Sequence, residues 1–474
     1  MGRSDDLAQT GLAPESLPID IRTILGRFDL DPVTRPYICC PACHAIYPKP
    51  YPETCSYQLT PKSKPCGAQL WRTRTILGRG FSFPIREFVY QEMKYWLARL
   101  LSRNGLEDLM DAMLKRAMGK APEVMLDIWD APVFRELTMP DGTRFVDAPP
   151  GEARLIFGLS VDGFNPFQSK TAKQSVTVTA IYMYCLNLPP HLRYRPENMY
   201  LVGVIPGPGK PKTDWEINHF LRPLVDELLQ LWNSGVYYSR TSKYVGGRLV
   251  RCALVPLVCD LPAARQVAGF GSYSSAYFCH MCNLGLDDID ELDMDKWGIR
   301  TCEEHRKAAE AWRDMPSVAQ RKAAFKLNST RWSALLDLPY WDPIRFTVID
   351  SMHNHYLGLL QDHCRKIWGM NIDVTEEDDQ PTPSAEDVAA ALDIFYTGTA
   401  QQLSTCTRAV IKHLCNLLSV RYKKTSKAHM INRLLEHVST YSRYACSTQL
   451  TPNPAYQGRP AASGARVKFT DGPI

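Results

Sequence analysis

The feature that most constrains the fold is an ordered run of apolar segments between residues 154 and 260. Residues 214–235 carry apolar side chains on one face at helical spacing and predict an amphipathic helix. Residues 247–260 predict a strand that follows this helix. Before the helix, three short segments rich in β-branched and aromatic residues predict strands over 154–161, 175–188 and 198–207. The predicted order is therefore strand, strand, strand, helix, strand.

Two of these predicted strands end on an aspartate. Asp162 follows the first strand in "LIFGLSVDGFNPF", and Asp260 ends the fourth in "GRLVRCALVPLVCD". This is the element order of the RNase H-like fold, in which the first and fourth strands are neighbours at the centre of the sheet. We therefore predict an α/β protein with an RNase H-like core, a mixed sheet flanked by helices, in which Asp162 and Asp260 lie close together.

Paired carboxylates at such a position suit a divalent metal site. Phosphoryl transfer on nucleic acids commonly uses two Mg²⁺ ions about 4 Å apart. Mg²⁺ prefers carboxylate oxygens and water as ligands, so the site needs acidic residues from separate elements that converge. Asp162 and Asp260 meet this requirement if the strand order is right. The alternative interpretation is that both are ordinary turn residues.

A third aspartate lies in "DSMH", where a predicted strand enters a helix. Asp350 ends that strand, and His353 follows in the turn or in the first helical turn. Asp350 is a candidate metal ligand, or a partner that orients His353. The alternative is that Asp350 caps the helix N-terminus while His353 simply packs.

The cysteines indicate metal sites rather than disulfides. The chain has 15 cysteines, an odd number, and its N-terminus lacks a signal-peptide core. Residues 36–72 predict a zinc-ribbon-like module that opens with a CxxC pair. We expect four thiolates to hold a structural, tetrahedral Zn²⁺ there: Cys40, Cys43, Cys55 and Cys66.

Other assignments of this first cysteine group are open. Cys39 competes with Cys40 for the same ligand position, and His44 is a possible substitute ligand. Buried free cysteines are the simplest alternative.

A second Cys/His group lies in a predicted insertion over residues 261–345. The segment "YFCHMC" supplies a CxxC pair, and "TCEEH" follows with a CxxH spacing. We expect a structural zinc site of three cysteines and one histidine: Cys279, Cys282, Cys302 and His305. His280 is the alternative histidine ligand.

A basic cluster lies between two predicted helices in the C-terminal part of the chain. The net charge is only +5, so the overall balance does not identify a partner. Lys/Arg beside a helix N-terminus suits phosphate binding, and the segment weakly resembles a SAP-type helical hairpin. The candidate DNA-binding residues are Arg421, Lys423, Lys424 and Lys427. The alternative is a solvated basic surface.

The remaining boundaries follow from changes in composition. No apolar run approaches the ~18 residues that a membrane helix needs, so no membrane partner is expected. The predicted segments are a polar leader over 1–35, a helical region over 84–150, the first part of the core over 151–260, its continuation over 346–371, an acidic linker over 372–387, a helical region over 388–438 and a disordered tail over 439–474.

Long collinear stretches over roughly residues 36–370 resemble CACTA-type (En/Spm-like) transposases, particularly the fungal ones. These stretches are "SVDGFNPF", "NLPPHLRYRPENMYLVGVIPGPGKP", "INHFLRPLVDELLQLWNSGV", "VCDLPAARQVAGFGSYSSAYFCHMC" and "RWSALLDLPYWDPIRFTVIDSMHNHYLGL". The resemblance implies a nuclear DDE/D transposase that binds the terminal repeats of its element. Such enzymes cut DNA with water and join the 3′-OH to target DNA, using Mg²⁺ or Mn²⁺.

The same resemblance assigns roles to individual residues. Asp162 matches the first catalytic carboxylate and Asp260 the second. Asp350 and His353 match an Asp-x-x-His motif of the catalytic core. The pair formed by Cys279 and Cys282 matches the family's zinc-like insertion.

The chain departs from the family at its final catalytic residue. In the family a glutamate lies on a later helix, near segments resembling "FER" and "NG", and no such segment occurs here. Glu386 and Glu436 lack that context. Two hypotheses follow: Asp350 serves as the third ligand of a transposase, or the chain is a truncated, catalytically inactive relative that binds DNA through zinc-containing modules. Enzymatic activity and homo-oligomerisation both stay open.

Overall fold

The computed structural model describes most of the chain in two compact units. The first unit is Met1–His363 and the second is Cys364–Ile474. The described residues are 23, 26, 31–76, 78–165, 177–207, 215–370, 383–418, 420 and 426–444.

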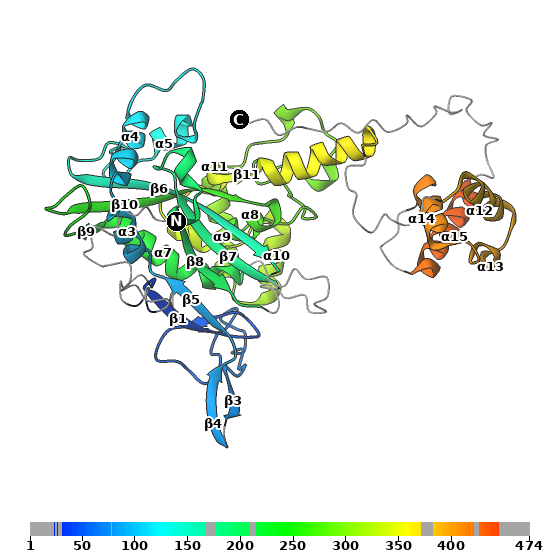
Figure 1. Ribbon diagram of the computed structural model, residues 1–474, viewed down its shortest axis with the longest axis horizontal. Coiled ribbons are helices and arrows are strands. Elements are labelled where there is room, and N and C mark those ends of the chain that lie inside the picture. The colour runs from blue at the N-terminus through cyan, green and yellow to red at the C-terminus, as the bar shows by residue number, and fades with distance from the viewer. Residues whose placement is uncertain are drawn as a thin grey trace, which may run out of the picture. The chain divides into compact units, whose positions relative to one another are not determined.

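A nine-stranded mixed sheet forms the centre of the first unit (Figure 1). Its strand order is β11-β10-β6-β7-β8-β5-β1-β2, and β9 pairs with β10 beside this path. Only β6–β10 and β10–β11 are parallel pairs among the described strands. The strands are β1 (Thr34–Cys39), β2 (Ile46–Tyr47), β5 (Glu87–Gln91), β6 (Glu152–Phe164), β7 (Val178–Cys185), β8 (Met199–Ile205), β9 (Val236–Tyr238), β10 (Arg248–Cys259) and β11 (Thr347–Ile349).

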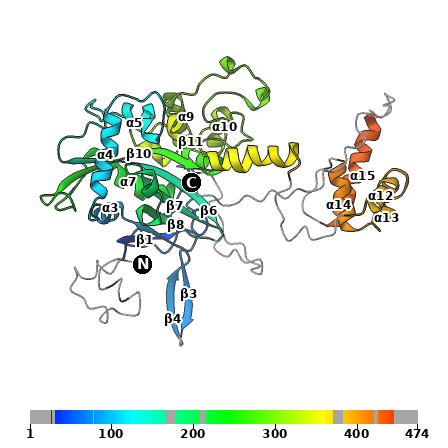
Figure 2. The ribbon, with the colours of Figure 1, turned by 45° about the horizontal axis from the view of Figure 1, so that its top comes forward.

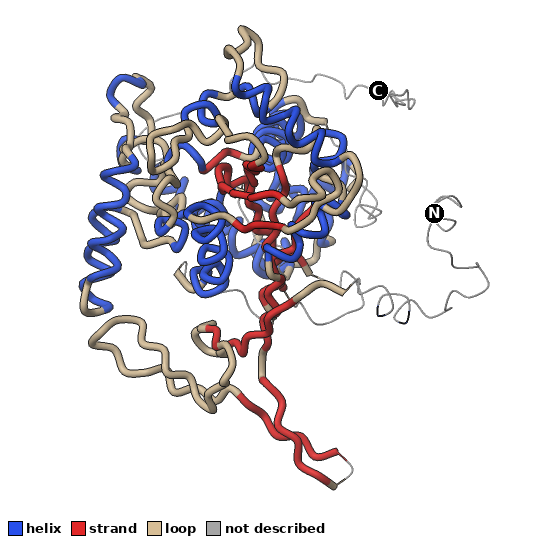
Figure 3. Tube along the Cα trace, turned by 90° about the vertical axis from the view of Figure 1, so that its left-hand side faces the viewer, coloured by secondary structure: helices blue, strands red, loops and turns tan. Residues whose placement is uncertain are grey.

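Helices cover both faces of this sheet (Figure 3). The α-helices of the first unit are α3 (Met93–Leu101), α4 (Leu106–Met118), α5 (Pro132–Glu136), α6 (Pro190–Arg193), α7 (Ile217–Asn233), α8 (Leu261–Ala268), α9 (Cys302–Asp314), α10 (Val318–Asn328) and α11 (Pro343–Phe346). Shorter or wider helical segments are η2 (Ile128–Asp130), η3 (Pro196–Asn198), η4 (Leu286–Asp288), η5 (Met294–Lys296), η6 (Ala334–Asp337) and η7 (Met352–Leu360), and η8 (His363–Ile367) spans the boundary between the two units.

The central strands and α7 form where the apolar pattern predicted them. From Ala153 to Val161, β6 is buried without interruption, as expected for a strand covered on both faces. On α7, Phe220, Leu224 and Leu228 recur at helical spacing and are fully buried, and the helix packs on β10. Two details differ from the prediction. β6 continues past Asp162 to Phe164, and the short strand β9 was not predicted.

The region predicted to be helical over 84–150 opens instead with a strand. β5 pairs with β1 on one side and with β8 on the other. Gly203 of β8 lets β5 approach closely, because a Cβ at this position would lie 2.6 Å from Phe88 Cε2 and 2.8 Å from the Val89 carbonyl oxygen. The cysteine-rich N-terminal module therefore shares one hydrogen-bonded sheet with the core. The helical part of this region is divided at Asn104-Gly105, between α3 and α4.

A separate two-stranded hairpin joins the cysteine-rich module to β5. Its strands are β3 (Trp71–Ile76) and β4 (Arg79–Pro84), which pair with each other and with no strand of the large sheet in the described structure. The hairpin extends away from the body of the unit (Figure 2).

The second unit is a small helical bundle with its own apolar core. Its helices are α12 (Ala385–Thr397), α13 (Ala400–Leu403), α14 (Arg408–Leu417) and α15 (Lys427–Tyr444). Ile411, Leu414 and Leu434 are fully buried within it. None of the helices in the described ranges is long and apolar enough to cross a bilayer.

Candidate functional site

Three neighbouring parallel strands carry an aspartate at the same end of the sheet: Asp162 lies inside β6, and Asp260 and Asp350 directly follow β10 and β11. The pairing of Leu257 with Leu159 puts Asp260 level with Asp162. The pairing of Cys259 with Ile349 likewise puts Asp350 level with Asp260. Because residues in register on adjacent strands share a face, the three carboxylates emerge on one face of the sheet. The sequence prediction that the strands leading to Asp162 and Asp260 are adjacent is therefore confirmed.

The negative charges of all three aspartates act on Cys259. Burial raises the pKa of Cys259 to about 12, and the negative charges of Asp260, Asp162 and Asp350 contribute in the same direction. The Cys259 thiol is fixed beneath them, because its Sγ accepts a hydrogen bond from the Val161 amide at 3.2 Å.

Each aspartate has a different local role. The Oδ1 atom of Asp260 accepts a hydrogen bond from the Ala263 amide at 2.7 Å, so Asp260 is also the N-cap of α8. Asp162 is exposed, whereas Asp260 and Asp350 are half-buried. All three side chains are therefore reachable from solvent.

Asp350 and His353 form a local pair. Asp350 Oδ1 accepts from the Met352 amide at 2.9 Å, and Asp350 Oδ2 lies 2.6 Å from His353 Nδ1. Burial acts to raise the pKa of Asp350, but the hydrogen bonds from His353 and Met352 outweigh it and the pKa falls below its usual value. The structure therefore pairs Asp350 with His353, as one interpretation of the sequence had it, whereas the packed histidine of the alternative is not seen because His353 is exposed.

The three carboxylates do not form a closed metal cage. In the described part of the chain, the one group of three or more potential ligands within 4.8 Å of one another consists of cysteines. Asp162, Asp260 and Asp350 do not form such a group, although they lie at the same end of the sheet. Glu386 and Glu436 lie in the separate helical unit, where Glu436 pairs with Arg433 at 2.5 Å.

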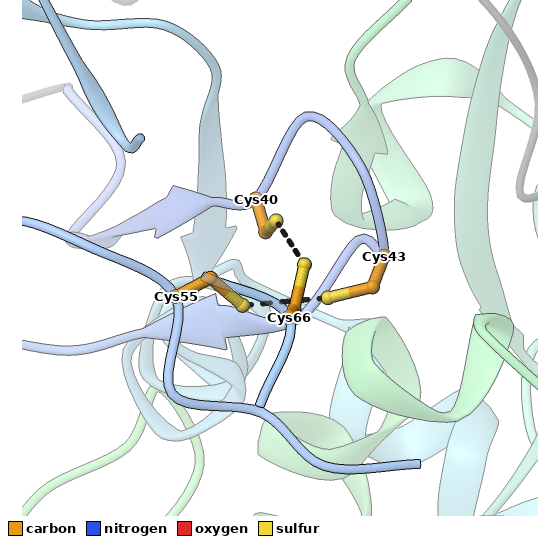
Figure 4. A group of neighbouring side chains, drawn as sticks. All are labelled: Cys40, Cys43, Cys55 and Cys66. Atoms are coloured by element: carbon orange, nitrogen blue, oxygen red, sulfur yellow. Dashed lines mark hydrogen bonds between the residues drawn. The ribbon is translucent and has the colours of Figure 1, made fainter. Parts of the chain in front are cut away.

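The cysteine group consists of the four residues predicted to bind zinc. The sulfur atoms of Cys40, Cys43, Cys55 and Cys66 all lie within 4.8 Å of one another and point toward a common centre (Figure 4). Cys43 and Cys55 are 3.4 Å apart, and Cys40 and Cys66 are 3.8 Å apart, measured between sulfurs. A tetrahedral ion with Zn–S bonds of about 2.3 Å requires sulfurs separated by about 3.8 Å. The donor set and its spacing therefore fit a structural Zn²⁺.

The competing ligand assignments are resolved by the direction of the side chains. Cys39 is fully buried in the main core and burial raises its pKa to about 12. The ring of His44 contacts other residues, with Nδ1 3.1 Å from Glu216 Oε2 and Nε2 3.1 Å from Arg86 Nη1. Neither residue belongs to the sulfur cluster.

The thiols of Cys40 and Cys43 shift each other's pKa in opposite directions. The hydrogen bond from Cys43 lowers the pKa of Cys40 to about 5, despite the opposing effect of burial. The same contact and burial raise the pKa of Cys43. The thiolate is the form that binds metal, so a lowered pKa of Cys40 favours metal binding at this cluster.

The second predicted zinc site is not brought together in the same way. Burial and the adjacent Cys279 thiol raise the pKa of Cys282, so this pair is close. Cys302 instead lies near Asp342 and Arg306. His305 packs on Phe270, with ring centroids 4.6 Å apart. No described group of three ligands includes Cys279, Cys282, Cys302, His305 or the alternative His280.

Most of the predicted basic cluster lies outside the described residues. Arg421, Lys423 and Lys424 fall in the gap at residues 421–425, and Lys427 begins α15. The DNA-binding role of this cluster therefore stays a prediction.

A tyrosine that was not predicted from the sequence borders the aspartates. Tyr182 lies opposite Ser160 on β7, on the same face as Asp162. Burial raises its pKa, and the charges of Asp162 and Asp350 act in the same direction. The alternation in "AIYMYC" was the available signal, because it places Tyr182 and Tyr184 on one face.

Comparison with known proteins points to DNA transposition. Residues 144–322 match the profile of the protein family described as Transposase family tnp2. The matched segment contains Asp162 and Asp260, but neither Asp350 nor the four-cysteine cluster. No curated protein matches the chain. The family match supports a transposase function.

Proposed function

We propose that the chain is a CACTA-type DDE/D transposase with an RNase H-like core, which binds transposon ends and cuts and joins DNA in the nucleus. The observation that carries the proposal is the register of β6, β10 and β11, which puts Asp162 of β6 level with Asp260 and Asp350, the residues that directly follow β10 and β11. The strand order β8-β7-β6-β10-β11, in which β7 is antiparallel to β6 and β8 while β6, β10 and β11 are parallel, supports this core.

Asp162, Asp260 and Asp350 would hold Mg²⁺ or Mn²⁺. Carboxylates from three separate strands are the donor set such hard ions prefer, and their exposure leaves positions for water and phosphate oxygens. When bound, these ions activate a water or 3′-OH nucleophile and stabilise the leaving oxygen.

The protein's own residues would position this site. A strand buried on both faces holds Asp162 at a fixed level, and the α8 amide fixes the Asp260 carboxylate. His353 holds the Asp350 carboxylate through Nδ1. Asp350 would thereby take the position of the third acidic ligand.

Mn²⁺-dependent cleavage of terminal-repeat DNA tests the proposal, with Asp260→Asn as the inactive variant. Asn retains the side-chain oxygen that caps α8 but lacks the charge, so folding should be preserved. Asp226→Asn is the matched control, because Asp226 is an exposed residue of α7. Cleavage at the wild-type rate by Asp260→Asn would overturn the assignment. DNA binding without any metal-dependent cleavage would indicate the inactive DNA-binding relative instead.

A further inference from the structure

The β3–β4 hairpin carries a basic and aromatic face that lies apart from the aspartates and the cysteine cluster. Its sequence, "WRTRTILGRGFSFP", contains three arginines and no acidic residue. Arg72 pairs across the strands with Phe83, and Arg74 pairs with Phe81. Because directly opposed residues share a face, these four side chains lie together. Arg79, in register with Ile76, lies on the same face nearer the tip.

This face is open to solvent and its charge is not neutralised. All three arginines are exposed, and Phe81 and Phe83 are 45% and 37% exposed. No ion pair within the described residues involves Arg72, Arg74 or Arg79. Exposed aromatic side chains between unpaired guanidinium groups mark a binding surface for a negatively charged partner with flat apolar groups.

The base of the hairpin is held firmly by the four-cysteine module. Trp71 Nε1 donates to the Pro52 carbonyl at 2.9 Å, and the Leu70 amide donates to the Glu53 carbonyl at 3.0 Å. Leu70 is fully buried in the same small core as Cys40 and Cys55. A hairpin that is anchored at its base and free at its tip can enter a groove without losing much conformational freedom.

The dimensions of the hairpin suit duplex DNA. Strands of six residues span about 20 Å at ~3.4 Å per residue, and each strand here has six residues. The major groove is about 12 Å wide and admits a two-stranded β-ribbon. We propose that this face of the hairpin binds duplex DNA, with the three guanidinium groups on phosphates and the two phenyl rings against sugars or base edges.

This inference rests on the proposed function, which identifies DNA as the negatively charged partner. It adds the surface of the protein that binds this DNA. The test measures binding of a labelled 30-base-pair duplex by fluorescence anisotropy, in zinc-containing buffer without Mg²⁺ or Mn²⁺. The test variant is Arg72→Gln/Arg74→Gln/Arg79→Gln. The control, Arg195→Gln/Arg240→Gln/Lys322→Gln, removes the same charge from exposed positions elsewhere.

The hairpin variant should bind about tenfold more weakly or worse near 0.1 M salt, and the control within about twofold of wild type. Its slope of log K against log salt should flatten by up to about 2.7, since each lost phosphate contact removes about 0.9. Replacing the same arginines by lysine should restore most of the slope. Phe81→Ser/Phe83→Ser should weaken binding while leaving the slope unchanged.

Two outcomes would overturn the inference. If wild type binds DNA and the hairpin variant matches the control in affinity and slope, the hairpin is not a DNA contact, and the proposed transposase function is untouched. If wild type itself shows no affinity for duplex at low salt, both the inference and the proposed function fail. Circular dichroism and zinc content of each variant verify that the exposed substitutions leave the fold intact.

Discussion

Asp260 and Asp350 lie at the same level on neighbouring parallel strands, each one residue beyond the pair formed by Cys259 and Ile349. Asp162 lies level with them on the other side of Asp260. The sheet therefore supplies three carboxylates from segments that are far apart in the sequence. Asp350 differs from the other two because it has a histidine partner in the next helical turn.

Removing this histidine should weaken metal binding without abolishing it. In His353→Ala, Asp350 loses the hydrogen bond that holds its Oδ2 atom and helps to keep its pKa low. The Mn²⁺ concentration that gives half-maximal cleavage should rise about tenfold, as is typical for groups that orient metal ligands. His355→Ala, at a neighbouring exposed position, should behave as wild type. Asp350→Asn should lose cleavage; if it does not, the third ligand is another residue.

The four-cysteine cluster should account for one tightly held zinc ion per chain. Cys43→Ser should lose that ion, because the remaining three sulfurs leave the tetrahedral site open. Cys39→Ala should retain it, since Cys39 points into the main core. Metal content by atomic emission gives the answer directly. Two zinc ions per wild-type chain would instead show that the residues around Cys279 and Cys282 rearrange to form the second site predicted from the sequence.

Gly203→Ala should destabilise the junction between the cysteine-rich module and the core. The added Cβ would lie 2.8 Å from the Val89 carbonyl, a backbone atom that cannot turn aside. We expect a loss of about 1–3 kcal/mol in unfolding free energy, as for other overpacked sites. Gly246→Ala meets no atom within 4 Å and serves as the control in urea unfolding. Equal stability of the two variants would mean that β5 is not held tightly against β8.

His305 should make the fold less stable in mild acid. Burial lowers its pKa to about 3, against 6.5 for the exposed residue. Its contribution to stability is complete above pH 6.5. This contribution is lost as the pH falls toward 3, because His305 is protonated in the unfolded state while it stays neutral in the folded state.

The loss should approach about 1.4 kcal/mol per pH unit below 6.5. In His305→Leu the slope of unfolding free energy between pH 6.5 and 4.5 should be shallower than in wild type. His219, whose pKa burial lowers to about 4, remains in both proteins and contributes the same background. Identical slopes would show that His305 is solvated or ligated rather than buried and neutral.

The sequence predicted the parts of the fold whose side-chain pattern is strong. β6, β10 and α7 are long and apolar, and their identities follow from periodicity alone. β5 was read as part of a helix, because its five residues are followed directly by α3 and only Phe88 and Tyr90 are buried. A strand this short is determined by its partners β1 and β8, which are distant in the sequence.

The same distinction between local sequence pattern and distant contacts applies to the candidate sites. The CxxC spacing of Cys40 and Cys43 fixes two ligands locally, and Cys55 and Cys66 return on short connections. The CxxH spacing of Cys302 and His305 suggested a similar site. These residues occupy the first turn of α9, where Phe270 and Asp342 determine the direction of each side chain. These contacts could not be predicted from the spacing of the cysteine and the histidine.

The continuous sheet from β2 to β11 has a mechanical consequence. The strand carrying Cys39 and the strand leading to Asp260 are five inter-strand steps apart, which at ~4.8 Å per step is about 24 Å across the sheet. Neighbouring strands are hydrogen-bonded at every step, so the distance between these two strands is fixed. Under the proposed function, DNA bound beside the four-cysteine module would therefore lie at a fixed distance from the three aspartates.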